Sequence, residues 1–339
     1  MVRWKRAATA VAAGCMLLAG CSSSSDGSSL AVRVPATPAV APVATTVPAG
    51  VVTPVGAAVH AMVLDPRTHV LAAVADPPTR LLLLNADALA APARTVALPA
   101  PAAQLVLSAP GGPLLVAVPG ALLRVDQHTG DVATTKVDAD VRSAMQLSDG
   151  RIAVGTANGA VLVLVLSADG TVAQRITGLA ETDVLVDTPR GLVALDRKQT
   201  AVQAVDVGKG TLGESLRAGD GATNAVTDRF GRVLVTDTAG GGLLAFSTGP
   251  LLLRQRFPVP GAPYALAYDP KTDLAWVTLT ERNQVVGYDV AGGEPVERYR
   301  FPTVTQPDAV AVDANTGAVL VASAAGVGVQ RIEPAGGSR

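Results

Sequence analysis

The 339-residue chain has few of the residues from which active sites are commonly built. It contains two cysteines and three histidines, and aromatic residues make up 3% of it. The histidines, His60, His69 and His128, are scattered, and no G-x-S-x-G, H-E-x-x-H or C-x-x-C motif occurs. Serine-hydrolase, zinc-protease and dithiol chemistry therefore have no sequence support. The low aromatic content also disfavours a lectin or a base-stacking nucleic-acid site.

Long hydrophobic runs are absent after the N-terminus, although 49% of the residues are hydrophobic. The longest aliphatic run there is Val161–Leu166, whereas a membrane-spanning helix needs about 20 apolar residues. The formal net charge of −1 gives no basic footprint for nucleic acid. We therefore expect no transmembrane helix in this part of the chain and no nucleic-acid partner.

The N-terminus has the three-part pattern of an export signal. Arg3, Lys5 and Arg6 precede a mostly apolar stretch, Ala7–Leu18, and small residues follow. The end of this segment, Leu18-Ala19-Gly20-Cys21, resembles a bacterial lipobox. That resemblance implies cleavage after residues 1–20 and a diacylglycerol on Cys21, with palmitate-type acyl chains anchoring the protein to the extracytoplasmic face of the cell membrane.

A second cysteine, Cys15, also follows small residues, but the apolar stretch before it is too short, so Cys21 is the expected lipid site. Cleavage there removes three basic residues and no acidic ones, which changes the net charge from −1 to −4. One acylated cysteine then remains, so no disulfide is expected. Residues 21–45 are rich in Ser, Pro and Ala, a composition that predicts a tether.

A repeated motif organises the remainder of the chain. Seven times, an apolar run ends at a turn, usually through Asp, and a second apolar run begins at once, as in YALAYDPKTDLAWVTL. Successive turn residues stand 39 to 44 positions apart: Asp65, Ser108, Ser148, Asp187, Asp228, Asp269 and Asp313. A four-stranded propeller blade needs about 40–45 residues. The pattern therefore predicts an all-β, seven-bladed β-propeller of four-stranded antiparallel blades over residues 46–334, with a disordered tail at 335–339.

The clearest repeat has predicted strands at Tyr264–Tyr268, Leu274–Leu279, Val285–Asp289 and Val296–Phe301. The last repeat supplies only three strands. We expect the segment around Val43–Val52 to provide the fourth, because this pairing closes the ring and leaves no unpaired sheet edge.

Two segments carry a family resemblance. Ala275-Trp276-Val277-Thr278 with Asn283-Gln284-Val285-Val286-Gly287-Tyr288-Asp289 resembles the YVTN-type repeat, and Pro307–Asp313 matches the entry strand of such repeats. Together with the lipobox, the chain resembles the actinobacterial propeller lipoproteins of the LppL kind. The resemblance implies a membrane-anchored β-propeller in the cell envelope.

Polar residues stand at or beside the start of each predicted inner strand, where the loops of a propeller surround its central channel. They are His60, Gln104, Arg142, Asp183, Asn224, Tyr264 and Asp308. A ring of hydrogen-bonding side chains at a concave mouth suits a small polar ligand. The alternative is that these are ordinary solvated residues at strand starts.

Two arginine pairs form a second candidate site, for partner docking. Arg254 and Arg256 lie in one predicted outer strand, and Arg298 and Arg300 lie in the next. The i, i+2 spacing places each pair on one face of its strand. They suit an acidic partner or an anionic glycolipid, or they are edge charges that block sheet-to-sheet pairing.

The sequence thus favours a monomeric, lipid-anchored, non-enzymatic scaffold that binds an envelope protein or a small polar ligand. No cofactor is expected: the G-x-G-x-x-G at residues 208–213 lies between two predicted strands, without the helix that a dinucleotide site needs. The alternative function is a lactonase-like hydrolase with a divalent cation, Ca²⁺ for example, held at the channel mouth by Asp183, Asn224 and Asp308. Carboxylate and amide oxygens suit Ca²⁺.

Overall fold

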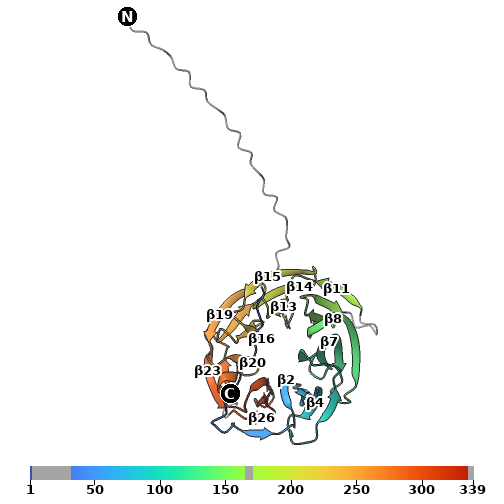
Figure 1. The fold of residues 1–339 in the computed structure, drawn as a ribbon, viewed down its shortest axis with the longest axis vertical. Helices are drawn as coiled ribbons and strands as arrows, with labels where there is room; N and C mark the ends of the chain where they lie inside the picture. Colours follow the sequence, from blue (N-terminus) through green and yellow to red (C-terminus); the bar gives the residue numbers. More distant parts are fainter. Residues whose placement is uncertain (2–31, 165–170, 335–339) are drawn as a thin grey trace. The chain divides into compact units, whose positions relative to one another are not determined.

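The computed structural model describes residue 1 and residues 32–164 and 171–334, and its compact main unit spans Ala31–Arg339. The described part contains 26 strands and one 3-10 helix, η1 (Thr280–Arg282). The strands form six antiparallel sheets, which are arranged in a ring (Figure 1). Within these residues no helix is long and apolar enough to cross a membrane.

Four sheets contain four strands that are consecutive in the chain. The first is β2 (Ala58–Leu64), β3 (Val70–Asp76), β4 (Arg80–Asn85) and β5 (Arg94–Ala97). Further along the chain come β12 (Val184–Thr188), β13 (Gly191–Asp196), β14 (Ala201–Asp206) and β15 (Thr211–Arg217). The next sheet is β16 (Ala222–Thr227), β17 (Val233–Asp237), β18 (Gly242–Ser247) and β19 (Leu252–Pro258). The last of the four is β20 (Pro263–Asp269), β21 (Leu274–Leu279), β22 (Gln284–Asp289) and β23 (Val296–Pro302). The predicted four-stranded antiparallel repeat is confirmed in all four.

The expectation of seven separate sheets is wrong, because six are present. One sheet has six strands: β6 (Gln104–Leu107), β7 (Leu114–Val125), β8 (Val132–Gln146), β9 (Ile152–Thr156), β10 (Val161–Leu164) and β11 (Val172–Ile176). Its 15-residue strand β8 runs without interruption past Arg142, beside which the sequence predicted the start of a new repeat's inner strand. Hydrogen bonding therefore continues across a boundary where the motif predicted a break.

The sixth sheet closes the ring by pairing the first strand of the chain with the last. Strand β1 (Val51–Thr53) pairs antiparallel with β26 (Val329–Ile332), beside β25 (Val319–Ser323) and β24 (Pro307–Val312). The predicted N-terminal closing strand is thus present, although it lies at the end of the expected segment, around Val43–Val52, and extends beyond it. Its position gives the last sheet four strands, as the closure argument required.

Three of the repeated aspartates, Asp65, Asp269 and Asp313, mark their turns because each caps its own turn. Asp65, Asp269 and Asp313 are only 1 to 2% exposed, and the side chain of each accepts a hydrogen bond from the backbone N–H two residues later, at 2.8 to 2.9 Å. This Asx turn satisfies a backbone donor at the tight reversal between two buried strands. The motif is therefore a structural signal for the connection between first and second strands.

Aliphatic side chains fill the interfaces between neighbouring sheets, and strands β9, β10 and β21 are buried on both faces. The largest buried side chain is Trp276, which is 1% exposed. Its ring stacks against Tyr299 and Phe301, with centroids 5.7 and 6.3 Å away. Gly287 lies opposite Trp276 in the β21–β22 register, where an added Cβ would come within 2.9 Å of the indole ring.

Candidate functional site: the channel mouth

The seven polar residues predicted at the channel mouth all line one cavity of about 580 Å³. The cavity runs along the inner strands β2, β6, β16, β20 and β24 and reaches the start of β12. These strands all begin at the same end of the channel, so residues far apart in sequence meet there: His60, Gln104, Arg142, Asp183, Asn224, Tyr264 and Asp308. We call this end of the ring the mouth face. A volume of this size is in the range of small-molecule sites.

Asp183 is the most strongly perturbed acid of the cavity. One carboxylate oxygen accepts a hydrogen bond from the backbone N–H of Arg197 at 2.8 Å. Burial nevertheless raises the pKa of Asp183 to about 6, and the nearby charge of Glu181 adds to the increase. A carboxyl group with a pKa near neutrality exchanges its proton readily in the working range of most proteins.

Asp308 faces the same cavity from β24. Its carboxylate accepts a hydrogen bond from Gln306 Nε2 at 2.7 Å, and burial raises its pKa. Burial also raises the pKa of the Tyr264 hydroxyl, and the charge of Asp308 contributes to that shift. Each carboxylate thus accepts one hydrogen bond, Asp183 from the β13–β14 connection and Asp308 from its own connection. Among the described residues, neither carboxylate forms an ion pair with Lys, Arg or His.

Arg142 belongs to a charged cluster that the sequence did not reveal. Its Nε lies 2.9 Å from a carboxylate oxygen of Glu181, and Lys198 Nζ lies 3.0 Å from the other oxygen. Glu181 is only 4% exposed, so its charge is compensated by two cations at the cavity rim. Arg142 also lies 3.2 Å from Asp140.

The remaining mouth residues are engaged with neighbouring strands. Gln104 accepts a hydrogen bond from the backbone of Ala144 at 2.8 Å, and Asn224 Nδ2 donates to the backbone carbonyl of Tyr264 at 3.0 Å. His60 Nε2 lies 3.3 Å from Asp76. Asn224 and Gln104 therefore tie adjacent repeats together, and the three residues expected to hold Ca²⁺ have three different partners.

Glu181, Arg197 and Gln306 were not predicted from the sequence as residues of this site. A signal for two of them was present, because Glu181 and Gln306 each stand two residues before a predicted mouth residue, in the connection that leads into an inner strand. Arg197 follows β13 and comes to the mouth only because the end of β13 pairs with the start of β12, Leu195 with Val184. That proximity depends on strand register.

The described N-terminal segment, residues 33–42, lies across the mouth face, and we call it the strap. It makes hydrogen bonds to loops of three sheets: Arg33 to Lys198, Ala36 to the Arg197 guanidinium, Ala39 to Thr280, Ala39 and Ala41 to Gln306, and Pro42 to Asn283. Residues up to 45 had been expected to form a tether. The strap instead contacts two side chains of the mouth directly: Arg197, which lines the cavity, and Gln306, which holds Asp308.

The arginine pairs lie on the outer strands β19 and β23, as predicted. Acidic groups of the same chain lie close to three of them. Arg298 lies 2.9 Å from Asp289, Arg300 lies 2.6 Å from Glu297, and Arg256 lies 3.6 Å from Asp237. Arg254 donates to Ser247 Oγ at 2.9 Å. These pairings favour the interpretation of the four arginines as edge charges that block sheet-to-sheet pairing. Cys21, the expected lipid site, lies outside the described residues.

Comparison with solved structures identifies the architecture. A chain of Kuenenia stuttgartiensis hydrazine synthase aligns with a TM-score of 0.70 at 15% identity, over 84% of this chain and 97% of that one. A streptogramin B lyase aligns at 0.67 and 12% identity, over 83% and 95%. The fold is a β-propeller.

Two further structures align at similarly low sequence identity. A catalytically inactive variant of Staphylococcus aureus virginiamycin B lyase, solved with quinupristin, aligns at a TM-score of 0.66 and 11% identity, over 81% of this chain and 94% of that one. A chain of the mitotic checkpoint complex aligns at 0.70 and 14% identity, over 90% and 98%. No family model and no curated protein matches the sequence. Because the aligned proteins share the fold with this chain at low sequence identity, the comparisons establish the propeller scaffold alone.

Proposed function

We propose that this chain is a lipid-anchored, extracytoplasmic β-propeller that binds a small polar ligand or an envelope protein at its mouth face. The observation that carries the proposal is the convergence of seven polar residues on one cavity of about 580 Å³. Its wall offers carboxylates, guanidinium groups, amides and a phenol, so a ligand with both donors and acceptors fits it best.

The anchoring part of the proposal rests on the lipobox-like sequence that ends at Cys21. The strap is consistent with it, because the chain enters the propeller on the mouth face at Arg33. To test the anchor, the full chain is expressed in a bacterial host with a labelled fatty acid. We expect incorporation that Cys21→Ala abolishes and that the neighbouring Cys15→Ala leaves unchanged. Label retained in Cys21→Ala would refute this part.

We also infer that the six-stranded sheet is two repeat units fused, which gives seven repeats in six sheets. The first half of β8 pairs with β7 up to Asp140, and the second half pairs with β9 from Val141 onward. Strand β7 has the exposed pair Pro119-Gly120 at its middle, with a φ of 77° at Gly120. Pro followed by Gly at positive φ is the pattern of a type II turn.

Ligand binding is tested with a thermal-shift screen against divalent cations and small polar metabolites. A ligand at 100 times its Kd adds about 2.7 kcal/mol to stability. We expect a shift that is lost when Asp183, Asn224 and Asp308 are all changed to Ala, and that survives in the outer-edge variant Arg254→Ala/Arg256→Ala. If no compound shifts the transition, docking of a protein partner is the better form of the proposal.

A hydrolase with a divalent cation is the second candidate, and the pKa of about 6 at Asp183 is the observation that favours it. A carboxylate with such a pKa acts as a general base near neutral pH. Lactone hydrolysis that requires Ca²⁺ and falls at least about a hundredfold in Asp183→Asn would support it, since general acid–base catalysis contributes 10²–10⁴-fold. Equal rates of lactone hydrolysis in wild type and in Asp183→Asn would exclude this role for Asp183.

A further inference from the structure

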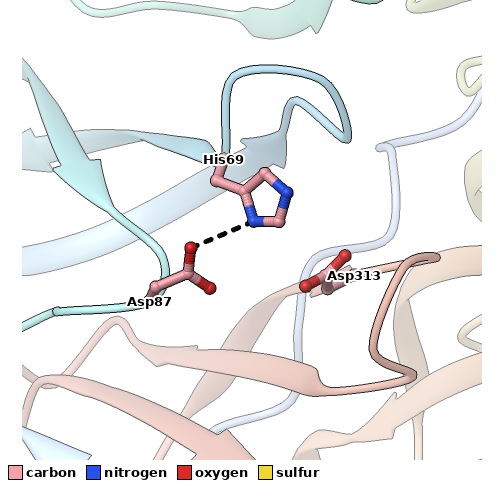
Figure 2. Close-up of side chains that lie close together, drawn as sticks. All are labelled: His69, Asp87 and Asp313. Atoms are coloured by element: carbon pink, nitrogen blue, oxygen red, sulfur yellow. Dashed lines mark ion pairs between the residues drawn. The ribbon is translucent and has the colours of Figure 1, made fainter.

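Three potential metal ligands meet at the seam where the first and last sheets of the ring come together. One ligand atom each from His69, Asp87 and Asp313 lies within 4.8 Å of the others. His69 and Asp87 belong to the first sheet, and Asp313 follows β24 in the last (Figure 2). The group lies at the turn end of the inner strands, away from the mouth face.

The backbone fixes all three positions. His69 has a φ of 56°, its N–H donates to Asp65 O, and its carbonyl oxygen accepts from Ala86 N. Asp87 N–H donates to Asn85 Oδ1 at 2.9 Å. Asp313 is 1% exposed and accepts hydrogen bonds from Asn315 N and Thr316 Oγ1 at 2.8 Å. Each oxygen of Asp313 keeps a second lone pair free for another partner.

The seam between the β16–β19 and β20–β23 sheets shows one way in which an acid in such a place is neutralised. The β20–β21 turn has the same Asp-Pro-x-Thr pattern as the β2–β3 turn, and Asp273 stands there at the position of His69, with a φ of 58°. Arg229 from the adjacent sheet binds Asp273 through two hydrogen bonds of 2.5 and 2.6 Å. At the closing seam the described residues supply no such arginine or lysine ion pair to Asp87 or Asp313, so the buried carboxylate there lacks a cationic partner.

His69 supplies the second observation. Its Nδ1 is a buried atom without a hydrogen-bond partner among the described residues, although it lies 3.1 Å from Asp87 Oδ2. In Figure 2 the imidazole edge that carries Nδ1 faces Asp87.

We propose that His69 Nδ1 and one carboxylate oxygen each of Asp87 and Asp313 bind Zn²⁺, with water as the fourth ligand. Zinc takes nitrogen and carboxylate ligands at about 2.0–2.2 Å in a tetrahedron, which places two ligand atoms roughly 3.3 Å apart. The 3.1 Å between His69 and Asp87 is close to that spacing. Calcium fits less well because it needs six to eight oxygens. The bound ion joins the first sheet to the last, beside the β1–β26 closure.

The test is zinc binding by the full chain after dialysis against a chelator, followed by isothermal titration calorimetry. We expect one Zn²⁺ per chain and a Zn²⁺-dependent rise in the thermal midpoint. His69→Gly preserves the left-handed backbone, because Gly adopts positive φ without strain, and Asp87→Asn changes a half-exposed side chain. Both should weaken binding by about tenfold or more, the scale seen even for indirect metal partners.

His128→Ala is the matched control, since His128 also lies in a turn that an aspartate caps and should leave binding unchanged. Cobalt substitution adds an optical readout, because a tetrahedral site gives an intense visible absorption that should disappear in His69→Gly. Absence of stoichiometric binding, unchanged affinity in both site variants, or a preference for Ca²⁺ over Zn²⁺ would each overturn the proposal. None of these results depends on the ligand of the mouth cavity.

Discussion

Replacement of Asp183 by Asn should stabilise the propeller at neutral pH. The folded state raises the pKa of Asp183 from 3.8 to about 6. The folded protein therefore binds this proton more tightly than the unfolded chain, and ionisation above the folded pKa costs stability. At 1.36 kcal/mol per pKa unit, the cost at neutral pH is about 3 kcal/mol. Asparagine keeps an oxygen acceptor for the Arg197 N–H without the charge.

The assay is urea unfolding of wild type and Asp183→Asn at a series of pH values. The stability of the wild type relative to the variant should be highest in acid and fall as pH rises, by about 2 kcal/mol between pH 4.5 and 7.5. Asp149→Asn is a control of opposite sign, because hydrogen bonds from Arg151 lower the pKa of Asp149, so this variant should lose stability at neutral pH only. Parallel pH profiles for wild type and Asp183→Asn would refute the reasoning.

Two further predictions concern the core and the strap. Trp276→Ala should destabilise the fold by about 3–5 kcal/mol, as truncation of a buried aromatic side chain does. Phe230→Ala, at a 47% exposed position, should cost under about 1 kcal/mol. Urea unfolding midpoints measure both losses, and equal losses would contradict the packing argument. Gln306→Ala removes the hydrogen bonds to Ala39 and Ala41. Amides of the strap should therefore exchange with deuterium faster than in wild type or in the control variant Gln255→Ala. Unchanged exchange would show that other contacts hold the strap.

The repeat was predictable because its cause is local. A buried aspartate that caps a tight turn must sit at a fixed place between two apolar strands, so Asp65, Asp269 and Asp313 mark the architecture directly in the sequence. The mouth residues were predictable for the same reason, since inner strands all start at one end of the channel. Each of these inferences needs only strand order.

Contacts that depend on register or on distant segments were not predictable. The predicted number of sheets was wrong because no feature of the sequence at Asp140-Val141 indicates that β8 continues from one repeat into the next. The strap was missed because its composition is that of a linker. Its docking depends on partners such as Gln306, 267 positions from Ala39. Composition predicts the behaviour of a segment in isolation and not its contacts with distant residues.

The seam between the first and last sheets is the place where the ring depends most on non-local contacts. The short connection from β1 to β2 joins the last sheet to the first, whereas the pairing of β1 with β26 inside the last sheet closes a loop of nearly the whole chain. That pairing carries the largest entropic cost of closure. The observed contacts concentrate there: β1 pairs with β26, Gln330 donates to Ala49, and Arg331 donates to Ala86. A metal bridge from His69 and Asp87 to Asp313 would act at the same place. A change at this seam should therefore lower the stability of the whole ring, because opening it exposes the faces of two sheets at once.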